Sequence, residues 1–162
     1  MVVLQHEIPL ETVHYVIDFC HQNKVPVILN PAPAAKVPLD IVDKVTFLTP
    51  NEHEAELIFG KDIPLEKLLK AYPEKLIVTR GEKGVSACLQ SGRICTIPAR
   101  KSKVIDTTGA GDTLNGAFAY SIASGDTIIE ALSIANIAAG LSVEKAGAQG
   151  GMPYAKDVFF IK

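Results

Sequence analysis

Short apolar segments alternate with segments of helical periodicity along most of this chain. The apolar segments are KVPVILN (24–30), KVTFLT (44–49) and KLIVT (75–79). Strands that are apolar throughout are typical of a parallel sheet buried on both faces, with helices as the crossover connections. The alternation therefore predicts the α/β class, with a mainly parallel sheet flanked by helices.

Local signals place the remaining elements. Helices are expected at 9–24, 51–60, 65–72, 110–124 and 127–145, with a short one from Tyr154, and further strands at 1–5, 84–89 and 92–98. Pro9 suits a helix start, Asn51 an N-cap and Gly60 a helix end. The helical stripe of Val13, Val16 and Ile17 extends to Cys20, which is expected in the core.

The last two predicted strands form a hairpin. A two-residue turn at Ser91-Gly92 would pair Leu89 with Ile94 and place Cys88 opposite Cys95. A disulfide there is sterically conceivable, but reduced thiols are favoured because the cytosol keeps thiols reduced.

Composition excludes several classes of partner. The 162 residues carry a net charge of −2, with 48% hydrophobic residues and no basic cluster, so no nucleic acid is expected. The start of the chain has no positively charged n-region, so no signal peptide is expected. The most apolar segment, 128–143, contains Glu130 and Asn136 and is too short to span a bilayer. No membrane association is predicted, and a soluble, cytoplasmic protein is expected.

Three polar or glycine-rich segments continue directly from predicted strands. A fourth stands where a further strand would end. They are LNPAPA (29–34), TPNEHE (49–54), TRGEKG (79–84) and DTTGAGD (106–112). In parallel sheets ligands bind outside the carboxyl ends of the strands, so these segments predict one shared cleft. In the last segment, glycines lead directly into a helix start, which is an anion site suited to phosphate.

Each of these residues also has a purely structural interpretation. Gly81 and Gly84 could be turn residues, and Asn51 could be only a helix cap. Glu54 could belong to a solvated helix face, as could Glu56. Asp112 could be an ordinary acidic residue that complements a helix dipole.

Four segments together carry a resemblance to a known family. DTTGAGDTLNGAF resembles the C-terminal signature of the phosphofructokinase-B, or ribokinase, family of carbohydrate kinases, and LTPNEHEAELIFG resembles its Asn-x-x-Glu segment. ILNPAPA and VTRGEKG are similar to stretches of the family's ribose kinases. The segments occur in family order between Glu7 and Pro153.

The resemblance implies roles for individual residues in phosphoryl transfer from ATP. Asp112 would be the general base that takes the proton from the sugar hydroxyl, and Glu7 would contact the sugar. The backbone of Gly109, Ala110 and Gly111 would form the anion hole. The nucleotide-binding residues would be Asn51, Thr79, Arg80, Gly81, Glu82, Lys83, Gly84, Gly111 and Asn136.

The resemblance also implies two metal ions. Glu54 would help to hold Mg²⁺ through water, because magnesium keeps much of its hydration shell. Positions matching a monovalent cation site, commonly for K⁺, are Asp106, Thr108, Ser142, Lys145, Gly147 and Gly151. Most of these would donate carbonyl oxygens.

The implied activity is an ATP-dependent sugar kinase, with ribose favoured by LNPAPA. The alternatives are a kinase of the same family for fructose or a nucleoside, and a catalytically silent nucleotide-binding module. Residues 1–162 are expected to be the C-terminal, nucleotide-binding and catalytic-base part of a single ribokinase-like domain, with the N-terminal portion and lid missing. A homodimer is expected. A part of a sheet expressed alone should self-associate through its uncovered apolar surface or adopt a compact but incomplete α/β core.

Overall fold

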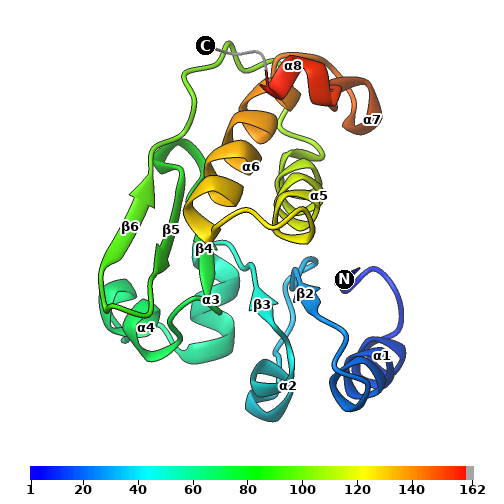
Figure 1. The fold of residues 1–162 in the computed structure, drawn as a ribbon, viewed down its shortest axis with the longest axis vertical. Helices are drawn as coiled ribbons and strands as arrows, with labels where there is room; N and C mark the ends of the chain where they lie inside the picture. The colour runs from blue at the N-terminus through cyan, green and yellow to red at the C-terminus, as the bar shows by residue number, and fades with distance from the viewer. Residues whose placement is uncertain (160–162) are drawn as a thin grey trace. The chain divides into compact units, whose positions relative to one another are not determined.

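The computed structural model describes residues 1–159, and it shows the predicted alternation of strands and helices (Figure 1). The chain forms two compact units. The first contains residues 1–81 and 86–96, and the second contains residues 82–85 and the described chain from Ile97 onward. The α/β prediction is confirmed, and the two units are described separately below.

Parallel strands form the centre of the first unit. β1 (Val2–Leu4), β2 (Val27–Leu29) and β3 (Phe47–Leu48) pair in that order, with Val3 across from Ile28 and Leu29 across from Leu48. Parallel bridges from Leu48 to Leu76 and from Asn51 to Thr79 place β4 (Ile77–Thr79) beside β3. All three β2 residues are buried, as expected for a strand covered on both faces.

Four helices connect these strands. They are α1 (Leu10–Gln22), α2 (Leu39–Lys44), α3 (Glu52–Phe59) and α4 (Leu65–Ala71). Pro9 occupies the N-cap of α1, and Val13, Ile17 and Cys20 bury one face of that helix, as predicted. Helix α2 was not predicted, because its six residues contain too few turns to show a helical period.

The hairpin formed by β5 (Val85–Cys88) and β6 (Ile94–Ile97) corrects one prediction. Leu89 N–H donates to the carbonyl of Arg93, and Gly92 N–H donates to the carbonyl of Leu89. The loop therefore has three residues, with Gly92 at φ 79°, and Leu89 lies across from Arg93 rather than Ile94. The predicted pairing of Cys88 with Cys95 was wrong by one residue, and all three cysteines are free thiols.

Helices make up most of the second unit. α5 (Ala110–Ala123) packs against α6 (Ile128–Ser142), and the short helices α7 (Ala148–Gly151) and α8 (Ala155–Phe159) both contact α6. Phe118 and Leu132 are among the buried residues of this pair. Helix α6 ends three residues earlier than predicted, and the chain turns after Val143. Among residues 1–159, no helix is long and apolar enough to cross a membrane.

Candidate active site

The turn before α5 depends on Gly109. This residue is the N-cap of α5 with φ 80°, a left-handed conformation that favours glycine. A Cβ at Gly109 would lie 3.1 Å from the Cα of Ala148, so the close approach of α7 also favours glycine. At Gly111, in the first turn, a Cβ would meet no heavy atom within 4 Å, so the space in front of this backbone is open. The N–H groups in the first turn of a helix generally lack internal acceptors, which suits an anion. Of the three residues predicted to form the anion hole, Ala110 already donates its N–H to the carbonyl of Thr107 at 3.2 Å.

Asp106 joins this turn to the loop after α6. Its carboxylate accepts hydrogen bonds from the backbone N–H of Thr108 at 2.9 Å and of Gly147 at 2.8 Å. The N–H of Gly147 and the groups of Thr108 lower the pKa of Asp106 to about 2. The carboxylate is therefore ionised at neutral pH, and it holds together two segments that are 41 positions apart in the chain.

The end of α6 gathers carbonyl oxygens beside α7. A Cβ at Gly151 would collide with the carbonyl oxygen of Ser142 and would lie 3.6 Å from that of Lys145. The Ser142 side chain itself donates to the carbonyl of Ala139 at 2.8 Å. Carbonyls at a helix C-terminus carry negative partial charge, so this arrangement fits a monovalent cation bound by carbonyls.

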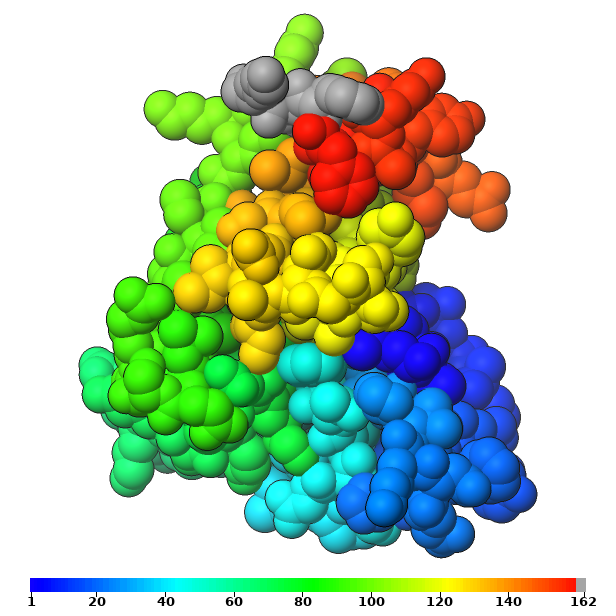
Figure 2. All heavy atoms as spheres, in the orientation of Figure 1, coloured from blue at the N-terminus to red at the C-terminus, as the bar shows by residue number. Residues whose placement is uncertain are grey.

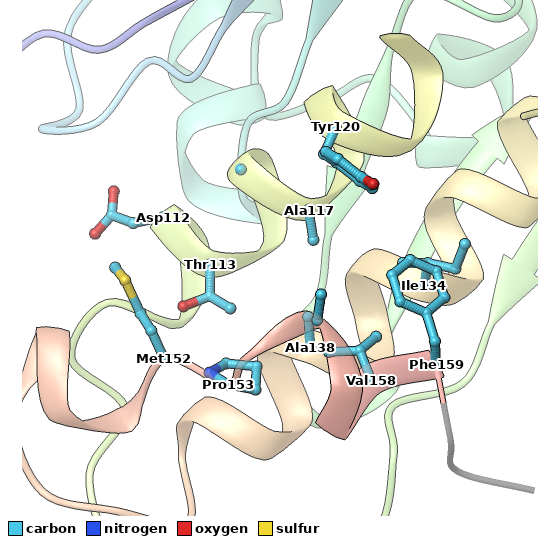
Figure 3. Close-up of a pocket in the computed structure, with 12 residues that line it drawn as sticks. Asp112, Thr113, Ala117, Tyr120, Ile134, Ala138, Met152, Pro153, Val158 and Phe159 are labelled. Atoms are coloured by element: carbon cyan, nitrogen blue, oxygen red, sulfur yellow. The ribbon is translucent and has the colours of Figure 1, made fainter. Parts of the chain in front are cut away.

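Asp112 lies exposed in the first turn of α5, at one end of a cavity of about 380 Å³ (Figure 3). Thr113, Ala117 and Tyr120 of α5 line the cavity together with residues of α6, α8 and the segment after α7. In the figure the Asp112 carboxylate points away from Tyr120 and Phe159 at the other end of the cavity. A carboxylate in this position is accessible to a substrate.

Asn136, predicted to lie near adenine, is buried within α6. Its Nδ2 donates to the carbonyl of Pro98 at 2.6 Å, so it holds the segment after β6 against the helix. Further along that segment, Arg100 forms an ion pair with Glu144 at 2.6 Å. Both contacts order the second unit, and the adenine contact of Asn136 stays a prediction.

In the first unit, Asn51 and Glu54 form a capping box at the start of α3. The Asn51 side chain accepts from the Glu54 N–H at 2.8 Å, and the Glu54 carboxylate accepts from the Asn51 N–H at 2.8 Å. Glu54 is only 5% exposed, so the alternative of a solvated helix face is wrong for this residue, whereas Glu56 is exposed. Burial raises the pKa of Glu54, and the bond from Asn51 opposes that shift.

The raised pKa of Glu54 bears on the predicted magnesium ion. Desolvation disfavours a carboxylate that has no cation nearby, and a hydrated Mg²⁺ would favour the ionised form. The buried carboxylate of Glu54 therefore fits a role in holding Mg²⁺ through water.

The predicted nucleotide loop, 79–84, begins at the end of β4. The Thr79 N–H bonds the carbonyl of Pro50, which places this loop beside the start of α3, and Arg80 forms an ion pair with Glu52 at 3.0 Å. A 3₁₀ turn, Gly81–Lys83, follows and is exposed. Gly84 has a structural role, because its φ is 88° and a Cβ there would collide with the carbonyl of Ile97.

Glu7 is exposed in the turn after β1, and the structure gives it no role. The neighbouring His6 was missed by sequence analysis. It is buried, its Nδ1 lies 3.3 Å from the carbonyl of Pro33, and burial lowers its pKa. No signal in the sequence marks this residue, because its burial depends on a loop 27 positions away.

Each unit therefore brings together its own part of the predicted site. The first unit joins Asn51, Glu54 and Thr79 at the start of α3. The second joins Asp106, Thr108 and Gly147, and it places the Ser142 and Lys145 carbonyls beside Gly151.

Comparison with known proteins assigns the chain to a family. A profile of the pfkB family carbohydrate kinases matches residues 2–155. A ribokinase from Bacillus subtilis is 48% identical over 98% of this chain and 53% of its own length, and one from Lactococcus lactis is 46% identical over 98% and 52%. The structure of an Arabidopsis thaliana ribokinase complexed with ribose and ATP superimposes with a TM-score of 0.87 and 31% identity, covering 98% of this chain and 54% of that one.

The chain belongs to the pfkB family of carbohydrate kinases. The fold is the ribokinase-like α/β fold. The chain spans about half the length of the curated relatives that it matches.

Proposed function

We propose that this chain supplies the nucleotide-binding and catalytic-base part of an ATP-dependent ribose kinase. Residues 1–162 would then be part of one kinase domain. The observation that carries the proposal is the Gly109–Asp112 turn, where an open helix start lies directly beside an exposed carboxylate. Two further findings support the proposal. The relatives from Bacillus subtilis and Lactococcus lactis are ribokinases, and the similar structure from Arabidopsis thaliana is a ribokinase complexed with ribose and ATP.

In this proposal, the first turn of α5 acts on both reactants of the phosphoryl transfer, the phosphoryl group of ATP and the attacking hydroxyl of ribose. The backbone of Gly109, Ala110 and Gly111 stabilises the charge that develops on the transferred phosphoryl group. Asp112 accepts the proton of the attacking ribose hydroxyl. Phosphoryl transfer depends mainly on positioning and electrostatics, so this equipment suits the reaction.

ATP would contact Asn51, the 79–84 loop and the region of Asn136. Mg²⁺ would supply positive charge to the phosphates, with Glu54 oriented toward its water shell by the capping box. A monovalent cation, K⁺ by preference, would be held by Asp106, Thr108 and the carbonyls of the 142–151 loop. Its effect would be to stabilise the backbone turn that forms the anion hole.

A chimera tests the proposal. This chain would replace the matching part of the Bacillus subtilis ribokinase, and ribose-dependent release of ADP would be measured with Mg²⁺ and K⁺. Turnover with ribose well above that with fructose or a nucleoside is the expected result. A folded chimera that binds ATP but turns over no sugar would contradict the proposal and favour a silent nucleotide-binding module.

A further inference from the structure

Arg80 lies just beyond the last backbone pairing between two segments of the first unit. A parallel bridge joins Asn51 to Thr79, and the Thr79 N–H donates to the carbonyl of Pro50 at 2.9 Å. The next residue of each segment leaves the bridge, because Glu52 begins α3 and Arg80 leads into the 3₁₀ turn. Beyond this point the two segments are joined by side chains.

The side chains of these two residues form an ion pair. Arg80 Nε donates to Oε1 of Glu52 at 3.0 Å, across 28 positions of the chain. The Arg80 side chain is 24% exposed and that of Glu52 is 45% exposed, so water screens the pair and its contribution to the free energy of unfolding is small. Such a pair can orient a segment without being needed for the fold.

A second set of contacts joins Arg80 to the β5–β6 hairpin. Its Nη1 lies 3.5 Å from Oγ of Ser86, which in turn lies 2.9 Å from Oγ1 of Thr96. Ser86 is buried, whereas Thr96 lies on the edge strand β6, and green atoms of the hairpin reach the surface on the left of Figure 2. Because Arg80 and Ser86 flank residues 81–85, their contact joins the two ends of that loop.

These contacts occupy the charged group of Arg80. A guanidinium carries five N–H donors in a fixed planar arrangement, and here one points to Glu52 and another to Ser86. The carboxylate of Glu52 also balances the positive charge, which reduces the attraction of Arg80 for the phosphates of a nucleotide. The geometry therefore indicates a residue that orders the loop, rather than one that binds phosphate itself.

We propose that Arg80 is a positioning residue, which through Glu52 holds the beginning of the 79–84 loop beside the start of α3. Asn51 and Glu54, the residues predicted to serve the nucleotide and Mg²⁺, belong to that same helix start. A loop that is ordered before its ligand arrives loses less conformational entropy on binding, so the affinity for ATP rises. The inference rests on the proposed function in one respect, that this loop binds ATP.

Calorimetry with ATP, carried out on the chimera, tests the proposal without catalysis. Arg80→Met removes the guanidinium and should weaken ATP binding by about tenfold, because the loop must then be ordered on binding. Glu52→Gln removes the charge of the partner and should weaken ATP binding severalfold. The double variant should bind ATP little more weakly than Arg80→Met does, because both changes break one interaction.

Direct contact between Arg80 and the phosphates predicts a different response to Glu52→Gln. Loss of the carboxylate would then leave the positive charge of Arg80 unbalanced, so ATP binding would be unchanged or stronger. Either result would overturn the proposal. Losses that simply add in the double variant would also contradict it, since the two residues would then act independently.

Glu66→Gln is the matched control. Glu66 is likewise an acidic residue in the first turn of a helix, and it forms an exposed ion pair with Lys70 at 2.7 Å. This variant should leave the affinity for ATP unchanged. The melting temperatures of all the variants should stay close to that of the parent, because exposed ion pairs stabilise a fold only slightly. Equal losses of ATP affinity in Glu66→Gln and Glu52→Gln would refute the proposed role.

Steady-state kinetics separates positioning from a general structural defect. In an active chimera, Arg80→Met should raise KM for ATP by about tenfold and leave KM for ribose within about twofold of the parent value. Equal rises in the two KM values would indicate a general defect and count against the proposal. A chimera that shows the expected losses of ATP affinity but turns over no sugar would contradict the proposed function and leave the role of Arg80 intact.

Discussion

Two aspartates at the ends of DTTGAGD lie in different environments. Asp106 accepts backbone hydrogen bonds from Thr108 and Gly147, and its pKa falls to about 2. Asp112 is exposed at the mouth of a cavity, where its carboxylate can reach a substrate. Asp106 therefore holds the turn in place, and Asp112 acts as the base in the proposed reaction.

Replacing Asp112 separates catalysis from binding. In the chimera, Asp112→Asn should reduce ribose-dependent turnover by a factor on the order of 10² or more, the scale of losing a general base. Affinity for ATP by calorimetry should change only a few-fold, since the backbone anion site is kept. Asp62→Asn, at an exposed position outside the site, is the control and should leave both values unchanged. Turnover near that of the parent would reduce Asp112 to a residue that complements the helix dipole.

The pKa of Asp106 predicts a pH dependence of stability. A pKa lowered from 3.8 to about 2 means that the carboxylate stabilises the folded state above about pH 4 and loses this effect as the pH falls toward 2. The parent should therefore exceed Asp106→Asn in free energy of unfolding at pH 5 to 7, measured in urea. The difference should shrink progressively below pH 4. A difference that is constant between pH 3 and pH 7 would show that the charge does not matter.

At the scale of elements, two helices begin with the same device. Both α3 and α6 start with a capping box, formed by Asn51 with Glu54 and by Thr127 with Glu130. Only the box of α3 involves a buried carboxylate and a residue beside the predicted nucleotide loop. Variants of the two caps can therefore separate an effect on helix stability from an effect on nucleotide binding.

Asn51→Ala and Thr127→Ala should each cost about 1 kcal/mol of stability, the usual cost of losing an N-cap. Only Asn51→Ala should also weaken binding of Mg-ATP, because it releases the partner of Glu54. Urea unfolding and calorimetry with Mg-ATP measure the two effects. If both variants bind Mg-ATP as the parent does, the α3 box is a helix cap alone.

Adjacent glycines in α7 give a similar comparison. A Cβ at Gly151 would collide with the Ser142 carbonyl, whereas one at Gly150 meets nothing within 4 Å. Gly151→Ala should destabilise the fold by about 1–3 kcal/mol, the range for overpacking, and should abolish activation of the chimera by K⁺. Gly150→Ala should change neither value. Undiminished activation by K⁺ in Gly151→Ala would remove the 142–151 loop from the cation site.

At the scale of the whole molecule, large apolar side chains remain exposed. Tyr15 and Phe19 on α1 are 70% and 55% exposed, and β1 lies at the edge of its sheet with Val3 42% exposed. Exposed apolar surface next to a free strand edge favours association. The chain also spans only about half the length of its relatives.

These 162 residues expressed alone should therefore self-associate, bind adenine nucleotide weakly and phosphorylate ribose at no appreciable rate. The residues predicted to bind nucleotide are present, whereas the lid that the family resemblance implies is expected to lie outside this chain. Light scattering, calorimetry with ATP and a coupled ADP assay with ribose measure the three properties. Robust ribose-dependent turnover from a monomer would contradict this prediction.

The sequence alone determined the features that depend on near neighbours. The alternation of elements, the Asn51 cap, the Gly60 helix end and the GAGD helix start were all predicted, because periodicity, capping and turn chemistry act within a few residues. The family resemblance was also carried by contiguous segments. The parallel arrangement followed from strands that are apolar throughout.

The tertiary structure decided everything that depends on residues distant in the chain. The burial of Glu54 and His6, the bond from Gly147 to Asp106 and the ion pair of Arg80 with Glu52 have no local signature. The hairpin register also escaped prediction, because loops of two and three residues are both compatible with a Ser-Gly turn. Burial and pKa are set by what packs around a group in space, and only the folded chain brings those neighbours together.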